Sequence, residues 1–146
     1  MNKEVKINFT HNEFGEQNVE SAWATRHGSF YKLDNILFYA KNYSWGDIFS
    51  VEERDGELYA HELIEESGHS TVRLLFSKVK EVAKTRKELV KIGCSSELSN
   101  LSNLISIDIP SDISYAKILD YLVKGEKKGL WEYQEACIST LHNSQL

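Results

Sequence analysis

The chain has the size and composition of an ordinary globular protein. It contains 146 residues, of which 41% are hydrophobic and 27% are charged, and its formal net charge is -5. No apolar stretch reaches the ~20 residues that a membrane-spanning helix needs. The first residues lack the apolar core of a signal peptide, so we expect a cytoplasmic protein without membrane contact.

Residues 1–66 have the pattern of a small β-rich subdomain. Val5, Ile7 and Phe9 alternate with polar residues, whereas the polar stretch at 10–18 is typical of a loop. Asp55-Gly56 is a hairpin signal between two segments that favour strands. Further short strands are expected at 20–24 and 30–33, and residues 36–40 are apolar. We therefore predict a small β-barrel or rolled sheet.

Residues 67–146 show a change of period that predicts alternating strands and helices. Strands are expected at 70–76, 94–98, 104–109 and 131–138, and helices at 78–92 and 112–124. The first helix has an apolar stripe that contains Val79, Val82, Ala83, Leu89 and Val90. The second helix is predicted to begin after a cap at Ser111 or Asp112.

The order of these elements is that of a ferredoxin-like βαββαβ unit, in which two helices cover one face of an antiparallel sheet. In the strand at 104–109, we expect Ile105 and its alternate neighbours to face inward, and Ser106 and Asp108 to face outward. Cys94 and Cys137 fall on opposite edges, so we predict free thiols. The fold class is α+β, with the two subdomains closely packed and possibly one domain.

The charge is uneven along the chain. Residues 1–76 carry 13 acidic and 7 basic residues. Such a surface repels a phosphate backbone and attracts a basic protein, so nucleic acid is not an expected partner. Alternatively, the acidic residues serve only solubility. The candidate binding residues are Glu52, Glu53, Asp55, Glu57, Glu62, Glu65 and Glu66.

None of the five histidines has metal-ligand spacing, so no metal or cofactor is predicted. His11 and His27 are expected in turns, His61 on a strand, and His142 in the tail. His69 precedes Ser70 at the start of a strand, where adjacent side chains diverge and cannot form a nucleophile and base pair. A capping or bulge role across the subdomain junction is therefore favoured over catalysis.

Two polar motifs suggest a shared structural site. They are residues 43–47 (YSWGD) and 67–73 (SGHSTVR). We predict that they meet at the junction of the two halves, where Arg73 is ion-paired or hydrogen-bonded. The junction residues of interest are Tyr43, Trp45, Asp47, His69 and Arg73.

These motifs, in order and spacing, resemble those of a bacterial domain family of unknown function, the one numbered 4265. The resemblance covers about residues 18–140 and also includes segments 20–23 (ESAW), 33–36 (LDNI) and 131–137 (WEYQEAC). Because that family has no established active site, the resemblance implies no catalytic residue.

Small acidic bacterial proteins of this kind resemble immunity proteins that neutralise polymorphic or contact-dependent toxins. We therefore expect a non-catalytic protein that occludes a basic toxin, for example a nuclease, with charge complementarity accelerating association. The alternative is a small-molecule sensor or enzyme with a site at the junction, lined by His69, Arg73, Trp45 and Asp47, because ligand pockets often occur where domains meet.

Overall fold

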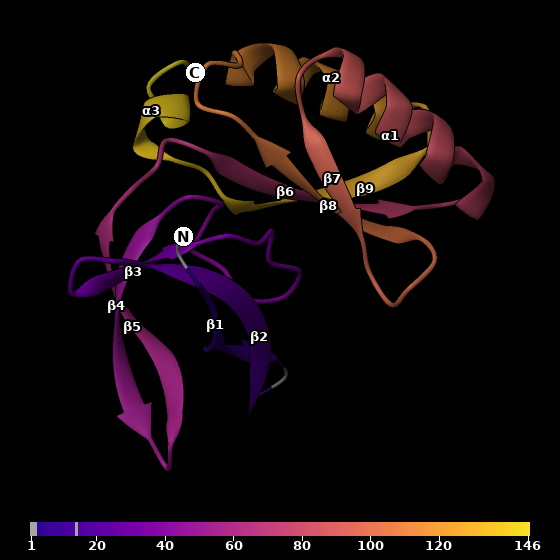
Figure 1. Ribbon diagram of the computed structural model, residues 1–146. Helices are drawn as coiled ribbons and strands as arrows, with labels where there is room; N and C mark the ends of the chain where they lie inside the picture. Colours follow the sequence, from indigo (N-terminus) through magenta and orange to yellow (C-terminus); the bar gives the residue numbers. More distant parts are fainter. Residues whose placement is uncertain (1–2, 14) are drawn as a thin grey trace.

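The computed structural model of the protein describes residues 3–13 and 15–146 and contains two sheets. Strands β1–β5 form the first sheet and strands β6–β9 the second (Figure 1). The elements in chain order are β1 (Glu4–Glu13), β2 (Glu16–His27), β3 (Phe30–Leu33), β4 (Ile48–Arg54), β5 (Glu57–Glu65), β6 (Ser70–Phe76), the 3₁₀ turn η1 (Val79–Glu81), α1 (Val82–Lys91), β7 (Ser95–Leu98), β8 (Leu104–Ile109), α2 (Tyr115–Lys127), β9 (Trp131–Cys137) and α3 (Thr140–Asn143).

The first sheet closes into a ring because β1 pairs with β2 along its length and also with β5, at Asn8 and Tyr59. Apolar residues such as Ile7, Phe9 and Phe49 fill its interior. The predicted β-rich first half is thus confirmed.

The prediction of a loop at residues 10–18 is wrong. His11 pairs with Asn18, and Asn12 with Gln17, so the hairpin of β1 and β2 continues to both sides of Phe14, which lies outside the described residues. The first four residues of β2 are exposed, so polar side chains there are compatible with a strand.

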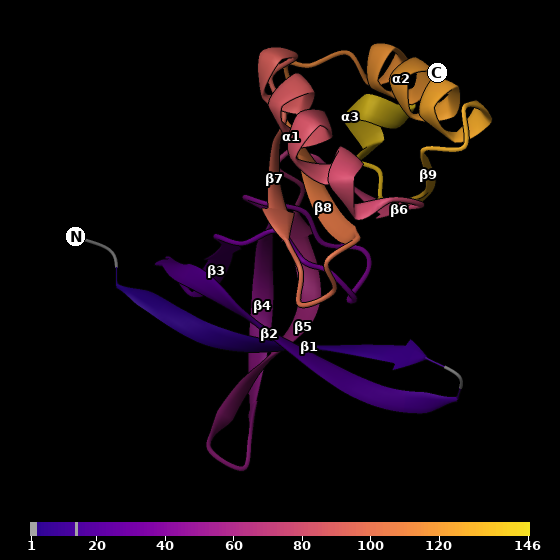
Figure 2. The same ribbon diagram turned by 90° about the vertical axis from the view of Figure 1, so that its right-hand side faces the viewer.

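The second sheet has the order β7-β8-β6-β9 with antiparallel neighbours, and α1 and α2 lie together on one of its faces (Figure 2). This arrangement confirms the predicted four-stranded antiparallel sheet with both helices on one side. Val72 and Leu74 of β6 and Ile105 and Ile107 of β8 are fully buried beneath the helices. The two cysteines are free, as expected, and burial raises the pKa of Cys94 to about 12.

The apolar stripe predicted for α1 is only partly correct. Val82 and Leu89 are buried, but Val79 and Val90 are 53% and 67% exposed. The regular helix begins at Val82, after the 3₁₀ turn, and its buried side consists of Val82, Thr85 and Leu89. A helix that is covered on one narrow side buries positions i, i+3 and i+7 and leaves their neighbours in solvent.

Helix α2 begins and ends later than predicted. Its N-cap is Ser114, and the first helical amide, Tyr115 N–H, donates to Gln145 Oε1 at 2.8 Å. The helix then continues through Gly125 to Lys127, and Gly125 leaves room for the indole of Trp131. A Cβ atom at Gly125 would lie 1.9 Å from that ring.

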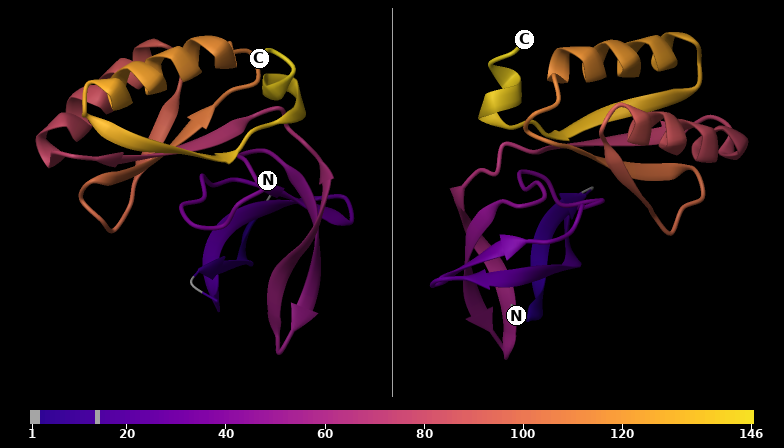
Figure 3. Two further views of the ribbon diagram at one scale, coloured as in Figure 1. Left: turned by 180° about the vertical axis from the view of Figure 1, so that it is seen from behind. Right: turned by 45° about the horizontal axis from the view of Figure 1, so that its top comes forward.

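The remaining face of the second sheet packs on the first half of the chain (Figure 3). Ser106 and Asp108, expected to point outward, do lie on the face opposite Ile105, yet they are 0% and 6% exposed. The prediction of solvent exposure was wrong because an alternating pattern does not show what covers the polar face. Ser106 Oγ donates to the Leu37 carbonyl at 2.7 Å, so this face is a polar interface between the two halves.

We predict that Gly125→Ala destabilises the protein. Glycine to alanine in an exposed helix interior normally stabilises by about 1 kcal/mol. Here the added methyl group enters the Trp131 ring, and we expect a loss of about 1–3 kcal/mol in the free energy of unfolding. Urea denaturation measures the change, with Lys127→Ala on the exposed side of the same helix as the control. An unchanged or increased stability of Gly125→Ala would contradict this packing.

Candidate functional site

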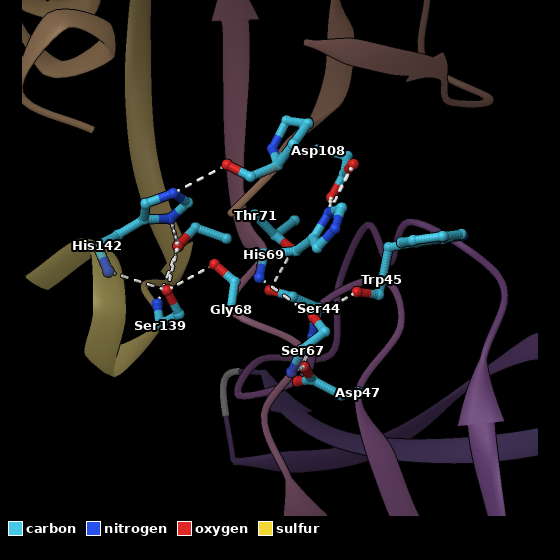
Figure 4. A network of polar contacts seen from close by, with 12 residues as sticks. Ser44, Trp45, Asp47, Ser67, Gly68, His69, Thr71, Asp108, Ser139 and His142 are labelled. Atoms are coloured by element: carbon cyan, nitrogen blue, oxygen red, sulfur yellow. Dashed lines mark hydrogen bonds and ion pairs between the residues drawn. The ribbon is translucent and has the colours of Figure 1, made fainter. Parts of the chain in front are cut away.

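The candidate site lies where the loop at 34–47 and the linker at 66–69 meet the polar face of the second sheet (Figure 4). The loop is held by Glu20 on β2, whose carboxylate accepts the amides of Phe38, Tyr39 and Ala40 at 2.7–2.9 Å. A carboxylate that accepts several backbone amides fixes loop geometry strongly. No sequence signal identified this role of Glu20, because its partners are 18–20 residues away.

Asp47 joins the two polar motifs. Its Oδ2 accepts the Ser44 amide at 2.9 Å and its Oδ1 accepts the Ser67 amide at 2.8 Å. Ser67 Oγ donates to the Trp45 carbonyl at 2.7 Å. Gly46 permits this approach, because it has a φ of 85° and a Cβ atom there would lie 3.1 Å from the Ser67 Cβ. The predicted contact between the motifs is confirmed.

Asp47 is 2% exposed, and its carboxylate accepts hydrogen bonds from two backbone amides. Burial raises its pKa, while the hydrogen bonds from Ser67 and Ser44 oppose that rise. Asp47 therefore acts as a structural anchor between the halves rather than as a group available to a ligand.

His69 forms a pair with Asp108 of β8. His69 Nδ1 lies 2.9 and 3.0 Å from the two carboxylate oxygens, and because a carboxylate only accepts, Nδ1 carries the proton. The Trp45 ring centroid lies 4.9 Å from that of His69. Burial raises the pKa of Asp108, an effect that the hydrogen bond from His69 partly offsets. The imidazole was expected to form a hydrogen bond across the junction, but its partner Asp108 belongs to the same half of the chain. The contact that His69 makes across the junction is the ring contact with Trp45.

A cavity of about 480 Å³ opens beside this pair. It lies between the 34–47 loop, the edge strand β7 and the His69–Asp108 pair. Its lining residues are Asp34, Asn35, Ile36, Trp45, His69, Ser95, Glu97 and Asp108.

Arg73 belongs to a different part of the junction. It is 7% exposed, and its guanidinium donates to the Ala40 carbonyl at 2.8 Å and to Gln134 Oε1 at 3.1 Å. The predicted hydrogen bonding of Arg73 is confirmed. Arg73 lines a separate cavity of about 580 Å³ together with His11 and Lys41.

The five junction residues therefore do not line one common pocket. Trp45 and His69 line the 480 Å³ cavity, Arg73 lines the second, and Asp47 lines neither. Tyr43 packs inside the first sheet, with its ring centroid 5.1 Å from that of Phe9. The motifs combine structural anchors with cavity residues, a distinction that their sequence does not reveal.

A buried cluster at the C-terminal end was missed. His142, expected in the tail, is fully buried, with Nδ1 2.6 Å from Ser70 Oγ and Nε2 3.0 Å from the Pro110 carbonyl. Ser139 Oγ donates to the Gly68 carbonyl and accepts the His142 amide. The N-cap pattern of Ser139 with His142 three residues later was the available signal. This cluster attaches α3 to the linker.

The other histidines differ less from expectation. His11 lies in β1 rather than in a turn, and its ring stacks on Tyr39 with centroids 5.8 Å apart. His27 is the last residue of β2, and His61 is on β5. Within residues 3–13 and 15–146, no three His, Cys, Asp or Glu side chains gather in a way that could hold a metal ion.

No helix in the described part of the chain is long and apolar enough to cross a membrane.

The acidic candidates lie on or beside strands β4 and β5. Glu53, Asp55, Glu57, Glu62, Glu65 and Glu66 are exposed, and Glu52 is half-buried. Glu52 accepts from Arg54 Nε at 2.8 Å. Glu66 accepts from Thr140 Oγ1 at 2.7 Å, so it also helps to fix α3.

Comparison with known proteins identifies the family. The model of the "Domain of unknown function (DUF4265)" family matches residues 20–133. The chain belongs to this family. The DUF4265 match includes both junction motifs, whereas β1 and the buried His142 lie outside it. No curated protein matches the chain.

A solved structure shares the fold of this DUF4265 protein. It is described as "Novel crystal structure of a hypothetical protein from Neisseria gonorrhoeae" and superposes with a TM-score of 0.81 at 18% sequence identity. The alignment covers 94% of this chain and 96% of the other. At this identity the likeness concerns the fold alone.

We predict that Asp47→Asn loosens the junction. An amide has one acceptor oxygen, so either the Ser44 or the Ser67 amide loses its partner. A buried donor without a partner costs about 1–3 kcal/mol in the free energy of unfolding. Urea denaturation and hydrogen exchange at Ser44 and Ser67 measure the effect. Asp34→Asn in the same loop is the control, and equal losses in both variants would contradict the assigned role.

Asp108 should make stability depend on pH. Its pKa in the folded protein is raised above the ordinary 3.8, so the folded state binds this proton more tightly than the unfolded chain. The stability contributed by this group is fully present below pH 3.8 and is lost as the pH rises through the folded value.

We therefore expect wild type to lose stability relative to Asp108→Asn as the pH rises from 3.8 through that window. Urea denaturation at a series of pH values measures the difference. Asp112→Asn, which removes an exposed carboxylate, should leave the Asp108 contribution intact. Parallel curves for wild type and Asp108→Asn would refute this linkage.

Proposed function

We propose that the protein is a non-catalytic binding module that captures a basic protein through its acidic hairpin, defined as residues 48–66 with strands β4 and β5. Seven acidic residues and one arginine give this segment a charge of -6. The whole chain carries -5, so the remaining residues carry +1. This concentration of charge is the observation that carries the proposal.

The shape of the acidic hairpin supports this role. The turn between β4 and β5 extends away from the second sheet (Figures 1 and 2). Asp55 and Gly56 have φ values of 51° and 82°, the positive pair typical of a tight type I′ turn. Arg54 binds Glu52 and lies over the Tyr59 ring at 4.5 Å, so this base is engaged locally. Glu66 is engaged by Thr140, and the exposed side chains of Glu53, Asp55, Glu57, Glu62 and Glu65 are the ones offered to a partner.

Within this class we propose an immunity protein that occludes a basic toxin, such as a nuclease. A nuclease needs a positive surface to hold a polyanionic substrate, and an exposed row of carboxylates complements that surface. The junction supports a non-catalytic role, because the side chains of Asp47, Arg73 and His142 are engaged in hydrogen bonds that hold the fold together. A cytoplasmic location fits protection against a toxin that enters the cell.

We also propose that residues 67–146 form a ferredoxin-like subdomain and residues 1–66 a small barrel-like one. The order β7-β8-β6-β9 and the connection βαββαβ support the first assignment. The closure of β1 on β5 supports the second.

The test begins with growth protection. The protein is expressed with each toxin encoded beside its gene in the native genome, and survival is measured. Association of the protected pair is then followed at several salt concentrations. In Glu53→Lys/Glu57→Lys/Glu65→Lys we expect association about tenfold slower at low salt, with the difference shrinking at high salt, because exposed charges act on the encounter rate. Glu52 is left unchanged because it binds Arg54.

The matched control is Asp112→Lys/Glu126→Lys/Glu132→Lys. It makes the same change in net charge at exposed positions outside the acidic hairpin. Equal slowing in both triple variants would assign the effect to net charge and overturn the hairpin as the docking element. Turnover of a small metabolite that is lost in His69→Ala, without binding or protection, would favour the sensor or enzyme alternative.

A further inference from the structure

We infer that the 480 Å³ cavity beside His69 binds the guanidinium or ammonium group of a basic side chain of the partner. This inference rests on the proposed capture of a basic protein and names a second contact for it. It concerns a pocket in the junction rather than the exposed carboxylates of the acidic hairpin.

The cavity is formed by four separate segments. Asp34 and Trp45 come from the 34–47 loop, Glu97 from β7 and Asp108 from β8, and His69 from the linker. Its volume lies in the range of pockets that bury a small ligand, about 300–1,000 Å³. A long basic side chain therefore fits.

The lining groups mostly accept hydrogen bonds. His69 Nδ1 donates its proton in a hydrogen bond to Asp108, so in the Nδ1–H tautomer the Nε2 atom is an acceptor. Asp34 accepts Trp45 Nε1 at 3.1 Å and keeps further lone pairs, and Glu97 is exposed. A guanidinium has five donors and no acceptor, and an ammonium has three donors. Both match an acceptor-rich pocket, whereas an anion meets carboxylates.

The aromatic part of the cavity also suits a cation. The Lys32 ammonium of this chain lies 6.0 Å from the centroid of the Trp45 ring. That distance is within the range of cation–π attraction. The indole thus already attracts one cation, and within the cavity it lies beside the imidazole of His69.

Proton affinities around the cavity agree with this chemistry. A hydrogen bond with Asp34 raises the pKa of Glu4, and burial raises the pKa of Asp108. The Glu4 shift reflects its proximity to Asp34, which lines the cavity, whereas the Asp108 shift reflects the loss of water around its carboxyl group. A cation bound beside either carboxylate would favour its ionised form.

The position of the cavity links it to the acidic hairpin. Asp47 immediately precedes β4, and Ser67 follows β5 by one residue beyond Glu66. Ser67 donates its amide to Asp47 and its hydroxyl to the Trp45 carbonyl. The base of the acidic hairpin is therefore continuous with the cavity, so a partner that binds the hairpin can insert a side chain there.

The test uses the free protein and blocked arginine. Nα-acetyl-arginine amide is titrated while NMR follows the Trp45 indole and the His69 ring, with Trp45→Phe assigning the indole signal. We expect saturable shifts with a millimolar dissociation constant. The citrulline analogue, in which an uncharged urea replaces the guanidinium, should give no saturable shift. Absence of saturation with arginine, or equal binding of citrulline, overturns the inference.

Two variants of equal charge change locate the site. Glu97→Gln removes a lining carboxylate and should weaken binding about fivefold, the order of a partly exposed ion pair. Glu126→Gln removes an exposed carboxylate of α2, outside both the cavity and the acidic hairpin, and should leave the affinity unchanged. Equal weakening in both variants would show binding to net charge and overturn the pocket.

The source of the cation is decided by two ligands. A blocked pentapeptide with central arginine represents a protein side chain, and agmatine, which carries a guanidinium and an amine, represents a free small-molecule cation. Peptide binding at least as tight as that of agmatine supports the partner side chain, whereas agmatine binding more than tenfold tighter overturns it. This result is independent of hairpin docking. The variant Glu53→Lys/Glu57→Lys/Glu65→Lys should still bind the arginine probe, even if the protein protects against none of the toxins tested.

Discussion

Burial of the polar face of the second sheet is the constraint on which the junction depends. Thr71 and Arg73 of β6 and Ser106 and Asp108 of β8 all face the first half and are buried. A buried polar group without a hydrogen-bond partner costs about 1–3 kcal/mol. The 34–47 loop supplies partners for three of them, with the Ser44 hydroxyl and two carbonyls, and His69 supplies the fourth. The conformation of the loop follows from this demand.

The same demand explains why two kinds of residue share one motif. Asp47 bonds to two backbone amides and is enclosed, so it serves to hold the halves together. His69, two residues after Ser67, satisfies Asp108 with one ring nitrogen and lines a cavity. A network of hydrogen bonds that pairs buried polar groups can thus also line a preorganised polar pocket where the network reaches the surface. In this protein that place is the gap between the 34–47 loop and β7.

The periodicity of the sequence predicted the helices and strands of the second sheet well, but the sequence predicted the burial of polar residues poorly. The change of period after β6 identified both helices, and the alternation in β8 identified its core side. The other side of β8 was misread, since alternating serine and aspartate have the same pattern beneath solvent and beneath another subdomain. His142 was missed because its partners Ser70 and Pro110 are 72 and 32 residues away. The 43–47 and 67–73 motifs correctly predicted the junction, yet only coordinates separated anchors from cavity residues.

The buried His142 cluster lies outside the segment that the family model matches, so this segment is shorter than the part of the chain that packs together. The family match extends from residue 20 to residue 133, but the ring of the first sheet needs β1, and the linker at Gly68 is fixed by Ser139. A fragment cut at the matched limits would open the ring and expose the apolar interior that Ile7 and Phe9 now fill. The cooperative folding unit is therefore larger than the segment by which relatives are recognised, and expression fragments should respect the former.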